Sequence, residues 1–227
     1  KHYLYLSIKK LFMKRICLVL VIVLISVSGI QAQSKIKSFF SGGINAGFIS
    51  NLSDFNNSMK ANFSDYNIKS IGQASIGFGV GMYFGERFTA AYKMNYALGN
   101  NLKDEQALNL YGGNLELNAG YSFLKKERFE LEANIGALAT VDNLVYNRKN
   151  PLGVNALSFS SANLFIPVKV YFWSYYQQKN KKEKLGFYLG YNILVYKGEV
   201  RYSGLDIKAD VGKFASNSLW AGVEFRM

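Results

Sequence analysis

Apolar residues alternate with small or polar residues along most of the chain beyond residue 39. In the segment ASIGFGVGMYF, residues 74–84, every second residue from Ala74 to Phe84 is apolar, and the residues between them are mostly glycine and serine. A period of two is typical of a β-strand, because successive side chains point to opposite faces of the sheet. The pattern therefore predicts a strand with one apolar face and one face of small polar groups.

The same alternation recurs often enough to predict eight strands, at residues 40–48, 74–84, 88–98, 114–123, 129–141, 165–173, 185–196 and 219–227. The segments between them alternate in length: 51–70, 99–109, 142–161 and 197–213 are long, whereas 85–87 and 124–128 are short and 174–184 is intermediate. Long loops at one rim and short turns at the other are typical of an up-and-down outer-membrane barrel. Pro167 is expected near the start of the sixth strand, where a missing hydrogen-bond donor is tolerated.

Two kinds of barrel fit this pattern, and the second face of each strand distinguishes them. A soluble lipocalin-type barrel buries its apolar face and shows a surface that is about a quarter to a third charged. A membrane barrel turns its apolar face to lipid and fills a narrow lumen with the other face. Here the second faces are mainly Gly, Ser, Asn, Ala and Thr, and aromatic residues gather near the strand ends. We therefore predict an all-β, eight-stranded antiparallel up-and-down transmembrane β-barrel, with ten strands as an open alternative.

The first 32 residues have the features of a secretory signal peptide. A basic Met13-Lys14-Arg15 precedes the apolar run ICLVLVIVLISVSG and a small residue, Ala32. Residues 1–32 are thus expected to be a leader, with Met13 as the true start and 1–12 as upstream sequence, and 33–227 to be the barrel. Five of the 27 basic residues lie in the leader, which leaves 22 basic and 15 acidic residues, a net charge of +7. Cys17 and His2 also lie there, so the barrel has no thiol or imidazole.

Several of these segments resemble a known group. The leader ending in QAQ, the glycine-spaced GINAGF and SIGFGVGMYF, the strand IPVKVYF and the terminal WAGVEFRM are similar to the small outer-membrane β-barrel proteins of Gram-negative bacteria. That superfamily includes OmpA-like, OmpX-like and porin-family or PorT-like barrels. The resemblance implies a place in the cell outer membrane, contact with its lipid and lipopolysaccharide, and assembly by the barrel-insertion machinery. Such barrels often end on an aromatic residue, whereas here Phe225 is followed by Arg226 and Met227.

The polar faces contain seven charged residues that we predict to form a lumen charge cluster: Lys93, Glu116, Glu130, Glu132, Lys169, Glu224 and Arg226. Counted from the turn rim, all except Glu116 should lie in the turn-side half of the lumen, as three cations and three carboxylates. Buried charges persist when they are paired, so we interpret the cluster as a salt-bridge plug. A proton or ion path, or acid–base chemistry by Glu130 and Glu132, are the alternatives. The basic segment 178–184 is expected to be a solvated periplasmic turn.

The resemblance also bears on function. Enzymes among outer-membrane barrels typically depend on histidine, and none occurs after residue 2. We therefore predict a protein that is not an enzyme and has no cofactor or metal. Its role would lie in envelope structure, or in adhesion and binding of a protein partner through four mobile extracellular loops. A narrow porin-like channel is the alternative, followed by a secreted lipocalin-type barrel. An exported protein without a recognition module is not expected to bind nucleic acid.

Overall fold

The computed structural model describes residues 36–49, 52–62, 64, 66, 68–103, 106–150, 153–178, 181–198, 200–203 and 216–227. The leader lies outside these residues, so its boundaries and Met13 as the start stay predictions. No helix in the described part of the chain is both long and apolar enough to span a bilayer.

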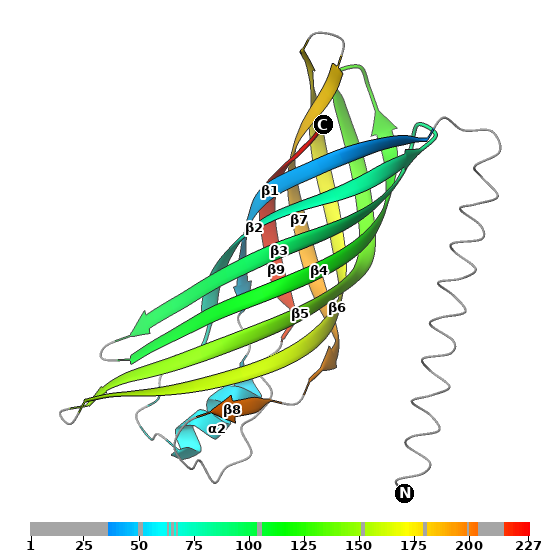
Figure 1. The fold of residues 1–227 in the computed structure, drawn as a ribbon. Coiled ribbons are helices and arrows are strands. Elements are labelled where there is room, and N and C mark those ends of the chain that lie inside the picture. The colour runs from blue at the N-terminus through cyan, green and yellow to red at the C-terminus, as the bar shows by residue number, and fades with distance from the viewer. Residues whose placement is uncertain are drawn as a thin grey trace, which may run out of the picture.

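Eight antiparallel strands form a closed ring, which confirms the predicted fold and strand number (Figure 1). Around the ring, each strand pairs with the next one in the chain up to β7, then β7 pairs with β9, and β9 pairs with β1. The elements are β1 (Lys37–Ile49), α2 (Ser53–Asn62), β2 (Ile71–Phe84), β3 (Phe88–Lys103), β4 (Gln106–Lys125), β5 (Phe129–Asn150), β6 (Gly153–Gln178), β7 (Lys181–Lys197), β8 (Arg201–Ser203) and β9 (Ser218–Arg226).

The short strand β8 continues β7 along the same edge of β6. The last β7 pair joins Asn163 to Lys197, and the β8 ladder resumes with Ser160 opposite Arg201. Three residues of β6 thus correspond to four residues of the β7–β8 edge, so the register slips by one residue between the two strands. The ring therefore has eight strand positions, and β8 extends the position of β7 beyond the end of that strand.

The apolar face of the barrel points outward. Ile44, Phe78 and Leu189 are each more than half exposed, whereas the opposite faces of the same strands are largely buried in the lumen. Such a surface is stable only against lipid, because it places a continuous apolar band outside a closed ring of strands. This orientation excludes the lipocalin-type barrel. Phe88, Phe172 and other aromatic side chains lie on the outside near the short turns, as expected of an interfacial girdle.

Three connections that the pattern predicted as loops or an extended turn are mostly strand. The β3–β4, β5–β6 and β6–β7 hairpins keep their pairing to the pairs Lys103↔Gln106, Asn150↔Gly153 and Gln178↔Lys181. The prediction of four mobile extracellular loops was therefore wrong for two of the four, because the segments 99–109 and 142–161 are largely paired backbone.

The apolar face changes sides at the extracellular end of β4, β5 and β6. Within the bilayer band, β5 turns Ile135 and Val141 outward, but a few residues later Leu144 and Tyr146 point inward and are buried. The outward residue between Leu144 and Tyr146 is Val145, which is half-buried. The preceding outward residue, Asn143, is exposed. This change of phase interrupts the alternation that predicts a single apolar face. It explains why the fifth predicted strand ends at residue 141.

Pro167 lies in the middle of β6, so its predicted place near a strand start was wrong. The β5–β6 ladder pairs Ile135 with Val168 and resumes at Leu138 with Phe165, which skips the position of Pro167. Proline has no N–H to donate, and a gap in the ladder tolerates that loss. On the other side, Pro167 still lies opposite Asn192 of β7.

Candidate functional site

The candidate site is the lumen, and its glycines make room for the large side chains that fill it. A Cβ atom on Gly186 would overlap the ring of Trp173, and one on Gly120 would lie 2.5 Å from a carboxylate oxygen of Glu132. On β2, a Cβ on Gly79 would lie 2.7 Å from the Lys93 side chain. An eight-stranded barrel is only just wide enough for its side chains. The glycine-rich inner faces therefore reflect crowding by residues of other strands.

The layer next to the turn rim is built around Glu130 of β5. Its Oε2 accepts a hydrogen bond from Lys184 Nζ at 2.7 Å, and its carboxylate also accepts hydrogen bonds from the hydroxyls of Ser122 and Tyr175. Lys184 Nζ lies 4.9 Å from the centre of the Tyr83 ring. The carboxylate and the ammonium group are thus both satisfied inside the barrel.

Arg226 forms the centre of the next layer. Its two terminal nitrogens donate to the two oxygens of Glu132 at 2.8 and 3.0 Å, the two-pronged geometry that guanidinium groups favour. Its Nε lies 3.5 Å from Glu224, and its guanidinium carbon lies 4.1 Å from the centre of the Trp173 ring. Thr89 and Asn134 donate further hydrogen bonds to Glu132. Arg226 is 2% exposed, so it is a buried cation.

Two lysine–glutamate pairs carry the cluster toward the middle of the lumen. Lys93 Nζ lies 2.5 Å from Glu224, which also accepts a hydrogen bond from the Tyr171 hydroxyl at 2.9 Å. Lys169 Nζ lies 2.5 Å from Glu116. All seven residues of the predicted cluster therefore point inward, and the structure brings each of them into an ion pair.

Aromatic rings pack among and beside these charges across the lumen. Tyr171 stacks on Trp173 with ring centres 4.9 Å apart and meets Tyr188 at 4.8 Å. The Tyr188 hydroxyl donates to Asn45 at 2.5 Å, and Trp220 completes this buried aromatic cluster. These rings and the ion pairs thus extend from the turn-side half of the barrel to the middle of the lumen, where Trp220 lies.

The middle of the lumen contains two small spaces between described residues. Two neighbouring cavities of about 30 and 20 Å³ share Asn114, Leu138, Asn192 and Trp220 in their linings. Each cavity can hold roughly one or two water molecules, since one water molecule needs a cavity volume of at least about 10–15 Å³. These two small cavities lie between the charged half of the lumen and its extracellular half.

The extracellular end is filled by a compact apolar core beneath α2. Phe55 and Met59 lie four residues apart on one face of α2 and are buried, and Phe55 meets Phe159 of β6 edge-on at 5.3 Å. Tyr66 packs against Tyr146 of β5 at 5.5 Å. The inward positions of the extended strands complete this core with Leu108, Leu110, Leu144 and Leu157. Burial raises the pKa of Tyr66, whose hydroxyl donates to Asn56 at 3.3 Å.

Two components of the lumen were not predicted from the pattern. Lys184 was assigned to a solvated turn, but it is buried on β7 and pairs with Glu130, so that assignment was wrong. Its place was predictable by extending the alternation of β7 back from Leu185, which points outward. The apolar core under α2 carries no such signal, because segment 51–70 is mainly polar and its contacts come from distant strands.

No group of three or more His, Cys, Asp or Glu side chains that could hold a metal occurs in the part of the chain described here. The lumen carboxylates Glu116, Glu130, Glu132 and Glu224 each have a cation in contact. The cluster thus contains four cations and four carboxylates once Lys184 is counted with the seven predicted residues. The lumen also holds Asp142, a carboxylate outside the cluster that accepts hydrogen bonds from Thr140 and Asn163.

The fold and its outward apolar band define the class: a transmembrane β-barrel of the outer-membrane type. No protein-family profile matches the chain, and no curated protein sequence matches it. Among solved structures it is similar to a major outer membrane protein of Thermus thermophilus, with a TM-score of 0.50 and 14% identity over 84% of this chain and 100% of that one. Neisserial surface protein A (TM-score 0.44, 14% identity, 85% and 98% covered) and Acinetobacter baumannii CarO (0.38, 11%, 81% and 96%) are also similar. At these identities the likeness to the Thermus protein shows the barrel fold alone.

Proposed function

We propose that this protein is a non-enzymatic outer-membrane β-barrel with a closed lumen, which acts in envelope structure and in binding through its extracellular surface. The observation that carries the proposal is the paired charge cluster packed against Trp173 and Tyr171. Its charges balance, and its side chains reach from one wall to the other. Opening a path would separate buried ion pairs, and leaving one such charge without its partner is strongly destabilising.

The state of the carboxylates supports a structural role for the cluster. General acid–base chemistry needs a group that can take up and release a proton near a substrate. Glu130 and Glu132, the candidates for such work, are both buried and engaged by Lys184 and Arg226. Neither carboxylate lines the two mid-lumen cavities described above. A plug is therefore the role that best fits their surroundings.

The extracellular end supports the binding role. α2 packs on the inner face of the extended β4–β6 sheet, so the surface above the bilayer is built on a core and its backbone is preorganised. Preorganised surfaces lose less conformational entropy when a partner binds. We propose that this end contacts a protein partner or the surrounding lipopolysaccharide. Assembly by the barrel-insertion machinery, with Phe225 as the terminal aromatic signal, belongs to the same proposal, and Phe225 lies on the outer face of β9.

Single-channel recording in planar bilayers tests the closed lumen. The barrel purified from membranes should give no discrete conductance steps once insertion is verified independently. Lys169→Ala removes one cation of the plug, and Arg87→Ala, at an exposed position on the turn rim, is the matched control. Steps from the unmodified barrel that change in Lys169→Ala but not in Arg87→Ala would replace the plug with the narrow-channel function.

A further inference from the structure

The outer face of the extended strands is mainly polar immediately above the lipid-facing band, and the described outward side chains of β3–β6 there carry no charge. It includes Asn100, Asn109, Tyr111, Asn143, Ser158 and Ser160, with two apolar members: Val145 lies between Asn109 and Ser158, and Leu102 is the next outward residue after Asn100. Asn100 and Asn109 lie opposite each other and are joined by a 2.9 Å hydrogen bond between their side-chain amides. A soluble surface is usually about 25–35% charged. These six positions instead offer amide and hydroxyl groups, which are suited to a hydroxyl-rich, neutral ligand.

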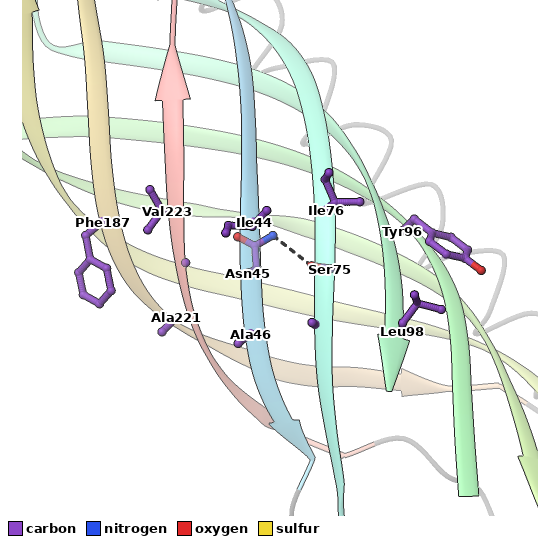
Figure 2. Close-up of a pocket in the computed structure, with 12 residues that line it drawn as sticks. Ile44, Asn45, Ala46, Ser75, Ile76, Tyr96, Leu98, Phe187, Ala221 and Val223 are labelled. Carbon is purple, nitrogen blue, oxygen red and sulfur yellow. Dashed lines mark hydrogen bonds between the residues drawn. The ribbon is translucent and has the colours of Figure 1, made fainter. Parts of the chain in front are cut away.

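An apolar groove lies beside this face, on the lipid side of the barrel. Its floor is a row of alanines in register across three strands, with Ala46 between Ala74 and Ala221. Bulkier neighbours, Ile44, Ile76 and Val223, form the next rung on the turn side (Figure 2). The groove has a volume of about 590 Å³, and its open side faces the bilayer.

The groove and the polar face adjoin on β3. Leu98 lines the groove and Asn100 belongs to the polar face; both point outward and are two residues apart. At about 3.3 Å per residue, this separation is roughly 7 Å along the strand. Asn100 lies on the extracellular side of Leu98, since β3 runs from the turn rim at Phe88 toward the β3–β4 hairpin. A lipid whose acyl chain lies in the groove would thus place its polar headgroup next to the amide and hydroxyl groups of this face.

We propose that these two surfaces together bind one glycolipid of the extracellular leaflet, with an acyl chain in the alanine groove and its sugars on the Asn–Ser face. Continuity with the lipid-facing band favours a membrane lipid over a soluble glycan. Arg201, exposed on β8 opposite Ser160, places a cation at the edge of the polar face that suits a phosphorylated sugar. The inference rests on the proposed envelope role and names the class of its ligand.

Native mass spectrometry of the detergent-purified barrel tests the assignment, with rough-type lipopolysaccharide and phosphatidylglycerol titrated separately. Phosphatidylglycerol has the phosphate and acyl chains but lacks the sugars. Ala46→Phe fills the groove floor with a side chain that lipid tolerates, and Ala139→Phe is the matched control at an outward position of β5 outside the groove. Asn109→Ala combined with Asn143→Ala removes two amides of the polar face.

The expected result is tighter binding of lipopolysaccharide than of phosphatidylglycerol, weakened about tenfold by Ala46→Phe and by the double variant but unchanged by Ala139→Phe. Equal binding of the two lipids, or equal binding by Ala46→Phe and Ala139→Phe, would overturn the proposal. A loss in Ala46→Phe with full binding by the double variant would overturn the glycolipid assignment. Conductance is a separate readout, so failure of the closed-lumen proposal is distinguishable from failure of this one.

Discussion

The part of the barrel within the bilayer and the part above it use the same strands but place apolar side chains on opposite faces. In the bilayer, the outer face is apolar and the inner face holds ion pairs around Arg226 and Glu132; above the bilayer, the outer face is polar and the inner face holds an apolar core around Phe55. The surroundings dictate the difference, because the turn-side half is surrounded by lipid and the extracellular half is surrounded by water. A strand that crosses the boundary must therefore change the phase of its alternation.

The charged half should be the most sensitive to substitution. Arg226→Ala removes the cation that neutralises Glu132, which is left buried without a cation, whereas Glu224 keeps its pair with Lys93. We expect the free energy of unfolding to fall by about 3–5 kcal/mol, the usual cost of breaking a buried ion pair. Urea unfolding of the barrel refolded into lipid vesicles measures the change. Arg87→Ala on the exposed rim is the control, and an equal, small effect of both variants would contradict a cluster that holds the lumen together.

The boundary between the halves can be located by charge substitutions on the outer face of β5. Ile135→Lys places a cation in the lipid band and should destabilise the barrel by about 2–4 kcal/mol, whereas Asn143→Lys, at the next outward position after Val141, should cost about 0–1 kcal/mol. Both side chains are exposed in the structure, so neither substitution disturbs the lumen directly. The same urea titration applies. Equal costs at the two positions would mean that the bilayer extends past the point where the strand changes phase.

The alternation of apolar and polar residues predicts the lipid-facing side of the strands better than it predicts the contacts on the lumen side. The strands, their number and the outward apolar band follow from the period of two, because every strand meets the same lipid on the outside. The seven charges were also predictable as inward residues, since they occupy the phase opposite the uncharged apolar face of each strand. Their partners were not: Arg226 meets Glu132 across 94 positions of sequence, and only the register of the closed ring brings them together.

The extracellular core escaped prediction for a related reason. The change of phase near Asn143 places Leu144 and Tyr146 inward, and taken alone this pattern indicates the end of a strand. The partner surface is α2, a short helix in a polar segment whose apolar residues, Phe55 and Met59, are too few to indicate a buried face by themselves. Most helical stability in proteins comes from such tertiary packing, which local sequence does not reveal.

Crowding in the lumen is expected to have a smaller effect than loss of charge. Gly186→Ala places a Cβ atom against the Trp173 ring, which is fully buried and packs against Arg226. Overpacking of this kind costs about 1–3 kcal/mol. Gly113→Ala is the control, because a Cβ atom at that outward position meets no other atom within 4 Å. Equal stability of the two variants in urea would show that the lumen has more free space than these distances imply.

The smallest effect on the barrel is expected from the apolar core. Phe55→Ala removes the ring that joins α2 to Phe159 and Tyr66, yet none of these contacts belongs to the strand ladder that closes the ring. Regions with separate cores can open independently of global unfolding. The free energy of unfolding measured in urea should therefore change by no more than about 0.5 kcal/mol, in the range of a peripheral substitution.

Limited proteolysis within residues 52–70 should nevertheless become much faster in Phe55→Ala, since a buried Phe→Ala change typically costs about 3–5 kcal/mol locally. Lys60→Ala, on the exposed side of α2, should leave both measurements unchanged. A large fall in barrel stability in Phe55→Ala would show instead that the two halves unfold as one cooperative unit. The core above the bilayer would then support the ring of strands as well as the surface that it carries.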